Sequence, residues 1–168
     1  MSSILKVDQL QDSGGNNLVT SNGSGVITAA GFGKVGQVVQ GSKTAFTSTT
    51  STSFSATGVK ATITPSSTSS KVLVQVSLNG VDSPGGTTRN TSFKIYRDGS
   101  LVQAIIDGYG YSSGMRTGNV SYSMLASPST TSATEFEVYF AEQGGSGSAV
   151  GINQYASGTG VSSTIILM

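Results

Sequence analysis

A period of two in the placement of apolar residues is the feature that most constrains how this chain folds. It is clearest in residues 71–81, where apolar side chains occupy one set of alternate positions: Val72, Val74, Val76 and Leu78. Successive side chains of a β-strand point to opposite faces, so this segment is predicted to be a strand with one buried face. No window places apolar residues at helical spacing over three turns, and the sequence therefore predicts no helix.

Further segments with strand character follow one another at short intervals. They are residues 59–63, 91–97, 101–106, 120–125, 135–141 and 163–168. The last is apolar almost throughout, which predicts a strand buried on both faces. Between residues 91–97 and 101–106, Asp98 and Gly99 match a type I′ hairpin turn, which needs two residues with positive φ.

Clusters of Ser, Thr, Gly and Pro separate these strands, and Ser, Thr and Gly make up roughly two-fifths of the 168 residues. From residue 36 onward we count roughly eight strands, which predicts an all-β, antiparallel, two-sheet β-sandwich of the jelly-roll type. Residues 34–168 would form this domain. Residues 1–33 contain only short apolar fragments between turns and are predicted to be an extended N-terminal arm.

Composition excludes several classes of function. The chain has no His and no Cys, which removes the usual general base, thiolate zinc sites and disulfides. A formal charge of +1 gives no electrostatic reason to bind nucleic acid or an acidic membrane, and no apolar run is long enough to span a bilayer. We therefore expect no cofactor, no metal, no membrane insertion and synthesis in a cytoplasm.

The acidic residues suggest two kinds of chemistry, both of which have simpler explanations. Glu135 and Glu137 lie on the same side of a predicted strand, as the carboxylate pair of a glycosidase would, but a solvated outer face is the favoured interpretation. Asp82, Asp98 and Asp107 are possible calcium ligands without the spacing of a calcium loop. The glycines of residues 107–114 precede no predicted helix, which argues against a phosphate-binding loop.

Aromatic residues near residue 110 suggest a binding surface instead. Tyr109, Tyr111 and Tyr122, together with Arg116, are predicted to form an exposed patch that stacks on sugars or docks a neighbouring protein. Ordinary packing of the tyrosines on the sheet, with their hydroxyl groups in water, explains the same residues equally well.

The chain also resembles a known group of proteins. Residues 4–17 (ILKVDQLQDSGGNN) and 18–27 (LVTSNGSGVI) resemble the N-terminal segment of surface proteins of tailed bacteriophages, especially those of marine cyanophages and pelagiphages. Similar phrases continue along the body of the chain, at residues 36–40 (GQVVQ), 63–74 (ITPSSTSSKVLV), 93–99 (FKIYRDG) and 163–168 (STIILM). These segments correspond to predicted strands and turns, and none of them contains a catalytic motif.

This resemblance implies a non-enzymatic virion structural protein on the particle surface, made in the cytoplasm of a bacterial host. The lack of a repetitive shaft favours a homotrimeric capsid decoration or cement protein, or a spike. Its partners would be its own copies and other virion proteins, such as the major capsid or tail proteins. In this hypothesis the arm pairs with neighbouring chains or with the particle through its apolar residues: Leu5, Val7, Leu10, Leu18, Val19, Val26 and Ile27.

Two alternatives remain at this point. The chain is a tail fibre or receptor-binding head that recognises glycans of the host surface, or it is an enzyme such as a polysaccharide depolymerase. The enzyme is the weaker alternative, because His is missing and the sequence offers no convincing carboxylate pair.

Overall fold

The computed structural model describes residues 9–21, 23–24, 27–29, 35–83, 90–110, 116–144, 147–154 and 161–168. The chain divides into two compact units, Met1–Val35 and Gly36–Met168. Every regular element in the described ranges is a β-strand, and every strand pairing is antiparallel.

The first unit is a small sheet in the order β1-β2-β3. Its strands are β1 (Gln9–Gln11), β2 (Asn17–Ser21) and β3 (Ile27–Ala29). The turn between β1 and β2 is organised by Asp12, whose Oδ1 accepts hydrogen bonds from the amides of Gly14 (2.8 Å) and Asn16 (2.9 Å). The hydrogen bond from the Asn16 side chain lowers the pKa of Asp12 most, and the two amide bonds add to it, because all three favour the charged form.

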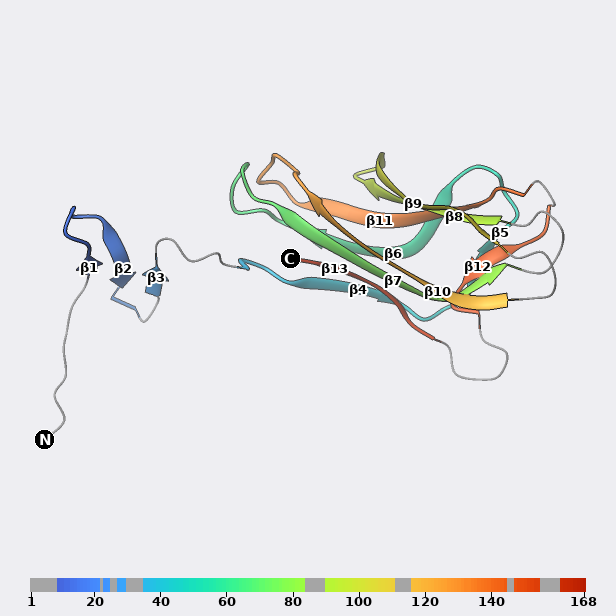
Figure 1. Cartoon of the computed structure of the whole chain (residues 1–168), viewed down its shortest axis with the longest axis horizontal. Coiled ribbons are helices and arrows are strands. Elements are labelled where there is room, and N and C mark those ends of the chain that lie inside the picture. The colour runs from blue at the N-terminus through green and yellow to red at the C-terminus, as the bar shows by residue number, and fades with distance from the viewer. Residues whose placement is uncertain are drawn as a thin grey trace, which may run out of the picture. The chain divides into compact units, whose positions relative to one another are not determined.

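The second unit is a β-sandwich of two sheets (Figure 1). The first sheet, named here the β7 sheet, has the order β4-β13-β7-β12-β5, with β10 also paired to β7; the second, the β11 sheet, has the order β6-β11-β8-β9. The strands are β4 (Val39–Lys43), β5 (Thr47–Thr49), β6 (Ser55–Ile63), β7 (Val72–Ser83), β8 (Asn90–Arg97), β9 (Ser100–Gly110), β10 (Arg116–Ala126), β11 (Thr134–Glu142), β12 (Val150–Ile152) and β13 (Ser163–Leu167). The predicted fold class, an all-β antiparallel sandwich of jelly-roll type, is confirmed.

The core lies between the two sheets, and the period-two pattern supplies it. The inward residues of β7 that the alternation indicated are all buried. On the opposite sheet, the largest buried side chains are those of Phe93, Phe136 and Phe140. Apolar groups removed from water in this way provide most of the free energy that favours a folded sandwich.

β13 differs from its prediction. It lies between β4 and β7, with Ile165 and Leu167 fully buried, but Thr164 and Ile166 are only half-buried. The prediction of two buried faces was therefore wrong. In an antiparallel sandwich each sheet has one face on the core, and the other face of β13 belongs to the outside of the β7 sheet.

The structure contains more strands than the sequence predicts, because β5 and β12 are short and do not alternate clearly. Both β12 and β13 pair with the same side of β7, one after the other along its length. The strand order of the β7 sheet therefore depends on pairings between distant segments, which no local sequence pattern predicts.

A buried polar network joins β7, β12 and β13 at one end of the β7 sheet. The Ser163 hydroxyl donates to Asn153 Oδ1 (2.7 Å) and accepts from the Asn79 amide (2.9 Å). Asn153, which has a φ of 61°, donates its side-chain amide to the carbonyl oxygens of Lys43 (2.9 Å) and Ala45 (3.1 Å). This network satisfies buried backbone groups that would otherwise lack partners.

The two sheets approach each other closely where β4 meets β6. A Cβ atom at Gly41 would collide with the carbonyl oxygen of Lys60, so only glycine fits at this position. The backbone of β4 therefore packs directly on β6 and closes this side of the sandwich.

Candidate functional site

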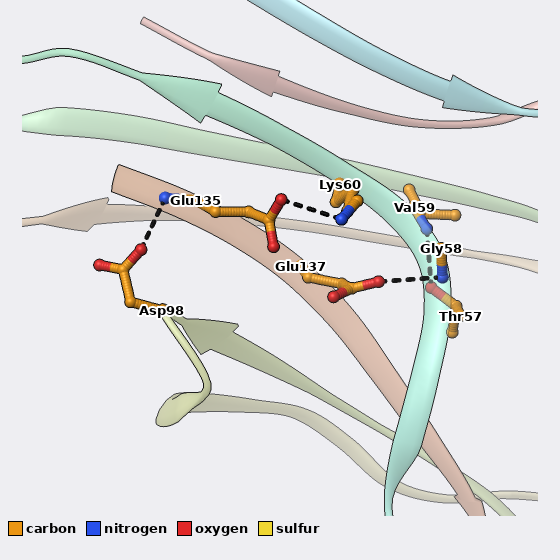
Figure 2. Close-up of polar contacts among 7 residues, drawn as sticks. All are labelled: Thr57, Gly58, Val59, Lys60, Asp98, Glu135 and Glu137. Carbon is orange, nitrogen blue, oxygen red and sulfur yellow. Dashed lines mark hydrogen bonds and ion pairs between the residues drawn. The ribbon is translucent and has the colours of Figure 1, made fainter. Parts of the chain in front are cut away.

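The hairpin turn between β8 and β9 is built by Asp98 and Gly99, whose φ angles are 48° and 78°. The turn is docked on the start of β11. The Glu135 amide donates to Asp98 Oδ1 (2.9 Å), and the Asp98 amide donates to the Glu135 carbonyl (3.0 Å). Figure 2 shows the Asp98 carboxylate turned toward the backbone of β11. Asp98 therefore has a structural role, which leaves the calcium hypothesis without one of its three ligands.

Glu135 forms an ion pair on the outer face of the β11 sheet. Its Oε2 lies 3.0 Å from Lys60 Nζ, and the side chains are 38% and 51% exposed respectively. The Glu135 carboxylate raises the pKa of Lys60, through their hydrogen bond first and through its charge second. Because both groups are in contact with water, the pair contributes little to stability.

Glu137 is engaged by the neighbouring strand. Its Oε1 accepts a hydrogen bond from the amide of Gly58 (3.2 Å), at a bulge where three residues of β6 lie opposite Val138 (Figure 2). At the same bulge the Thr57 hydroxyl donates to the Val138 carbonyl (2.7 Å). Both carboxylates of the glycosidase hypothesis therefore bind groups of their own sheet, an arrangement that supports their interpretation as part of a solvated outer face.

The outer face of the β11 sheet also carries an aromatic pair that the sequence analysis did not identify. The rings of Tyr96 on β8 and Tyr139 on β11 stack with their centroids 4.1 Å apart. Beside them, Lys94 Nζ lies 3.9 Å from the centroid of the Phe54 ring. The alternation of β8 and β11 places these tyrosines on the face that points away from the buried phenylalanines. The strand register, in which Glu137 pairs with Tyr96, brings the two rings together.

The predicted aromatic patch is only partly within the described residues. Tyr122 lies on the inner side of β10, where it packs against the core beside Met124. Tyr109 and Arg116 belong to β9 and β10, but their side chains are outside the description, as is the whole of Tyr111. Tyr122 lies two positions after the inward residue Val120 and so on the same face of β10. In the described residues it is therefore not part of a patch on the outer face of the sandwich.

The apolar residues of the arm are open to water where they are described. Leu10 on β1 and Leu18 on β2 are 54% and 41% exposed, and Val19 is half-buried. Ile27 belongs to β3, but its side chain is not described, and Leu5, Val7 and Val26 lie outside the described residues. The small sheet thus leaves leucine side chains available for contact with another surface.

Two acidic residues are buried at one end of the sandwich. Asp82 on β7 is only 5% exposed, and its burial raises the pKa of its carboxyl group. Glu142 at the end of β11 is fully buried, and its Oε1 accepts a hydrogen bond from the Gly144 amide (2.7 Å). Within the described ranges, no three potential ligands among His, Cys, Asp and Glu are close enough together to hold a metal ion.

A search of the described residues for a membrane-crossing helix found none of sufficient length and apolar character. No protein-family model matches the chain, and no curated protein matches its sequence.

The fold does match solved structures. The chain superposes on the VP2 subviral particle protein of infectious bursal disease virus with a TM-score of 0.52 and 12% identity, covering 86% of this chain and 35% of that one. A structure of the Gx strain of the same virus gives a TM-score of 0.49 and 13% identity, with 86% and 36% covered. The chain thus spans about a third of the length of these proteins, and at this identity the similarity is one of fold, a β-sandwich.

Proposed function

We propose that this chain is a non-enzymatic structural protein of a virus particle. The observation that carries the proposal is the likeness of its sandwich to the fold of a viral capsid protein, which extends over 86% of the chain. The engagement of Glu135 and Glu137 by their own sheet adds support, since neither carboxylate is held free for acid–base chemistry. The resemblance of the sequence to tailed-phage proteins supports a bacteriophage as the particle and the host cytoplasm as the place of synthesis.

Within that particle, the chain acts as a homotrimeric capsid decoration or cement protein, or as a spike, on the outer surface. The arm of residues 1–33 attaches it to the particle or to neighbouring subunits. Two features support this role for the arm: its strands have only three to five residues, and Leu10 and Leu18 are exposed. Such short strands gain stability when they pair with another chain, which supplies both hydrogen bonds and a covering surface.

The test is binding to phage particles from which the protein has been removed. Full-length chain should rebind the particles and sediment with them, whereas a chain lacking residues 1–33 should stay in solution with an unchanged sandwich. In the full-length chain, replacing both Leu10 and Leu18 with Ser should also abolish binding. Leu101→Ser is the control, because Leu101 is an exposed leucine of β9 outside the arm. Undiminished binding of the truncated chain would contradict the attachment role.

A receptor-binding head or tail fibre is the second candidate, and the aromatic pair favours it. Tyr96 and Tyr139 form a partly exposed ring surface beside charged side chains, a combination that can hold the apolar face and the hydroxyl groups of a sugar. A host-surface glycan bound by the wild type and lost in Tyr139→Ala would support this function. Density for the protein at the tail tip, and none on the capsid shell, would favour it over decoration.

A further inference from the structure

The outer face of the β7 sheet has a composition unlike the rest of the surface. Across β4, β13, β7 and β10 its side chains form three rows, as the strand register shows. The first row is Ser42, Thr164, Ser77 and Ser121; the second is Gln40, Ile166, Gln75 and Ser123; the third is Val38, Met168, Leu73 and Leu125. None of these side chains carries a charge.

The opposite surface of the sandwich shows the contrast. The outer face of the β11 sheet and its hairpin carry five charged residues: Lys60, Lys94, Asp98, Glu135 and Glu137. Arg97 has the inward register of Phe93 and Ile95, and its Nη1 donates to the Ser127 carbonyl (3.3 Å). On the β7 side, the charge nearest to the three rows along β7 is that of Lys71, one step beyond the third row, where its Nζ is bonded to the Ser127 hydroxyl (2.6 Å). Loss of charge is the main compositional difference between the centre of a protein interface and the rest of a surface.

The third row is also apolar along its whole length. Leu125 and Val38 are 64% and 61% exposed, and Leu73 and Met168 between them are half-buried. Leu73 and Met168 are held side by side by reciprocal backbone hydrogen bonds of 2.9 and 3.0 Å. A contiguous apolar row in such a position gains free energy when another surface removes it from water.

β10 borders this face, and beyond Arg116 and the register shift at Gly118–Val120 it lacks the features that usually protect an exposed strand. In the described residues it pairs with β7 alone, and residues 117–126 include neither a charged residue nor a proline. Edge strands of soluble proteins normally carry such residues, because bare edges pair with other chains. The other border of the sandwich, by contrast, is closed by the approach of Gly41 to Lys60.

We infer that this uncharged face, with the β10 edge beside it, is the contact between copies of this chain. The inference rests on the proposed self-assembly and names the surface that performs it. Side chains at a rotational symmetry axis meet their own counterparts in another copy, so a charged side chain there would face a like charge and be repelled. Serine and glutamine side chains both donate and accept hydrogen bonds, so each can pair with an identical side chain of another copy. Leucine and methionine can likewise pack against identical side chains through apolar contact.

Sedimentation of the full-length chain tests the surface with a matched pair of substitutions. Leu125→Lys and Leu101→Lys each add a charge at a leucine that is more than half exposed on a strand, so neither should disturb folding. The wild type and Leu101→Lys should sediment as oligomers, and Leu125→Lys as a monomer. An unchanged oligomer in Leu125→Lys would overturn the proposed surface and leave the virion role standing, and a monomeric wild type would overturn both the surface and self-assembly in solution.

Thiol labelling gives a second measurement that does not depend on contacts made by the arm. The chain has no natural Cys, so Ser123→Cys and Thr62→Cys each create a single thiol, both at exposed strand positions and on opposite faces of the sandwich. In the oligomer a maleimide should label Ser123→Cys about tenfold more slowly than Thr62→Cys, because the buried thiol reacts only when the contact opens. Equal rates in the oligomer would overturn the inference.

Discussion

Asp98 and Glu135 are joined by two hydrogen bonds: the Glu135 amide donates to an oxygen of Asp98 at 2.9 Å, and the Asp98 amide donates to an oxygen of Glu135 at 3.0 Å. One acceptor is the Asp98 carboxylate and the other is the Glu135 carbonyl. The β8–β9 hairpin is thereby fixed to the start of β11, so a residue that looks like a simple turn former also joins two parts of the sheet.

Replacing Asp98 with Ala should therefore cost more than the loss of a turn preference. Ala loses the hydrogen bond to the Glu135 amide and is strained at a φ of 48°, so we expect a loss of about 1–2 kcal/mol in the free energy of unfolding. Asp98→Asn keeps an acceptor oxygen and tolerates positive φ, and should lose less than about 0.5 kcal/mol. Urea unfolding measures both variants, and equal losses would contradict the docking role.

Gly41→Ala should destabilise the sandwich strongly. The added Cβ meets the carbonyl oxygen of Lys60, a backbone atom that moves only if β4 and β6 separate, so a loss of at least about 2 kcal/mol is expected. At Gly36 a Cβ would meet nothing within 4 Å, so Gly36→Ala is the control and should leave the unfolding midpoint almost unchanged. Thermal unfolding distinguishes the two, and a fully stable Gly41→Ala protein would show that the two strands are farther apart.

Ser163→Ala removes the centre of the buried polar network. The half-buried Asn79 amide loses its acceptor and the buried Asn153 Oδ1 loses its donor, so we expect a loss of about 1–3 kcal/mol. Ser162→Ala is the neighbouring control: its backbone carbonyl, which accepts from the Asn79 side chain (2.6 Å), is kept. Chemical denaturation of both variants should show a large loss for Ser163→Ala alone.

Asp82 should make the stability of the protein depend on pH. Burial raises its folded pKa above the ordinary value of 3.8, so the folded state holds this proton more tightly than the unfolded state. The contribution of Asp82 is most favourable below the unfolded pKa and is lost as the pH rises through the folded pKa. The free energy of unfolding of the wild type minus that of Asp82→Asn should therefore decrease as the pH rises through the folded pKa. A difference that grows with pH would contradict the burial of the carboxyl group.

The sequence was most informative where a feature depends on neighbouring residues. The alternation of residues 71–81 identified the inward side of β7, and the same rule separated Phe136 and Phe140 from the outward glutamates of β11. β5 and β12 were missed because their residues are short, polar or small and receive their strand conformation from β7 and from each other. Propensity is weak for such segments, and tertiary pairing decides their structure.

The candidate surfaces were harder to predict. Tyr96 and Tyr139 are 43 positions apart, and only the register of β8 against β11 brings their rings together. The uncharged face depends on four strands whose order in the sheet, β4-β13-β7 with β10 beside β7, does not follow the chain. The period-two pattern shows which residues lie on the same face of one strand. It contains no information on which strand lies next to that strand in the sheet.

The sequence by itself thus determined the class of fold, the inward side of the main strands and the chemistry that the chain lacks, because these follow from the geometry of one strand and from residue types. The tertiary structure alone decided that Gly41 meets Lys60, that Ser163 joins Asn79 to Asn153, and that the three outward rows on the β7 sheet bring uncharged side chains together. Those contacts join positions far apart in the chain, and their pairing is selected by the packing of the whole core rather than by any local pattern.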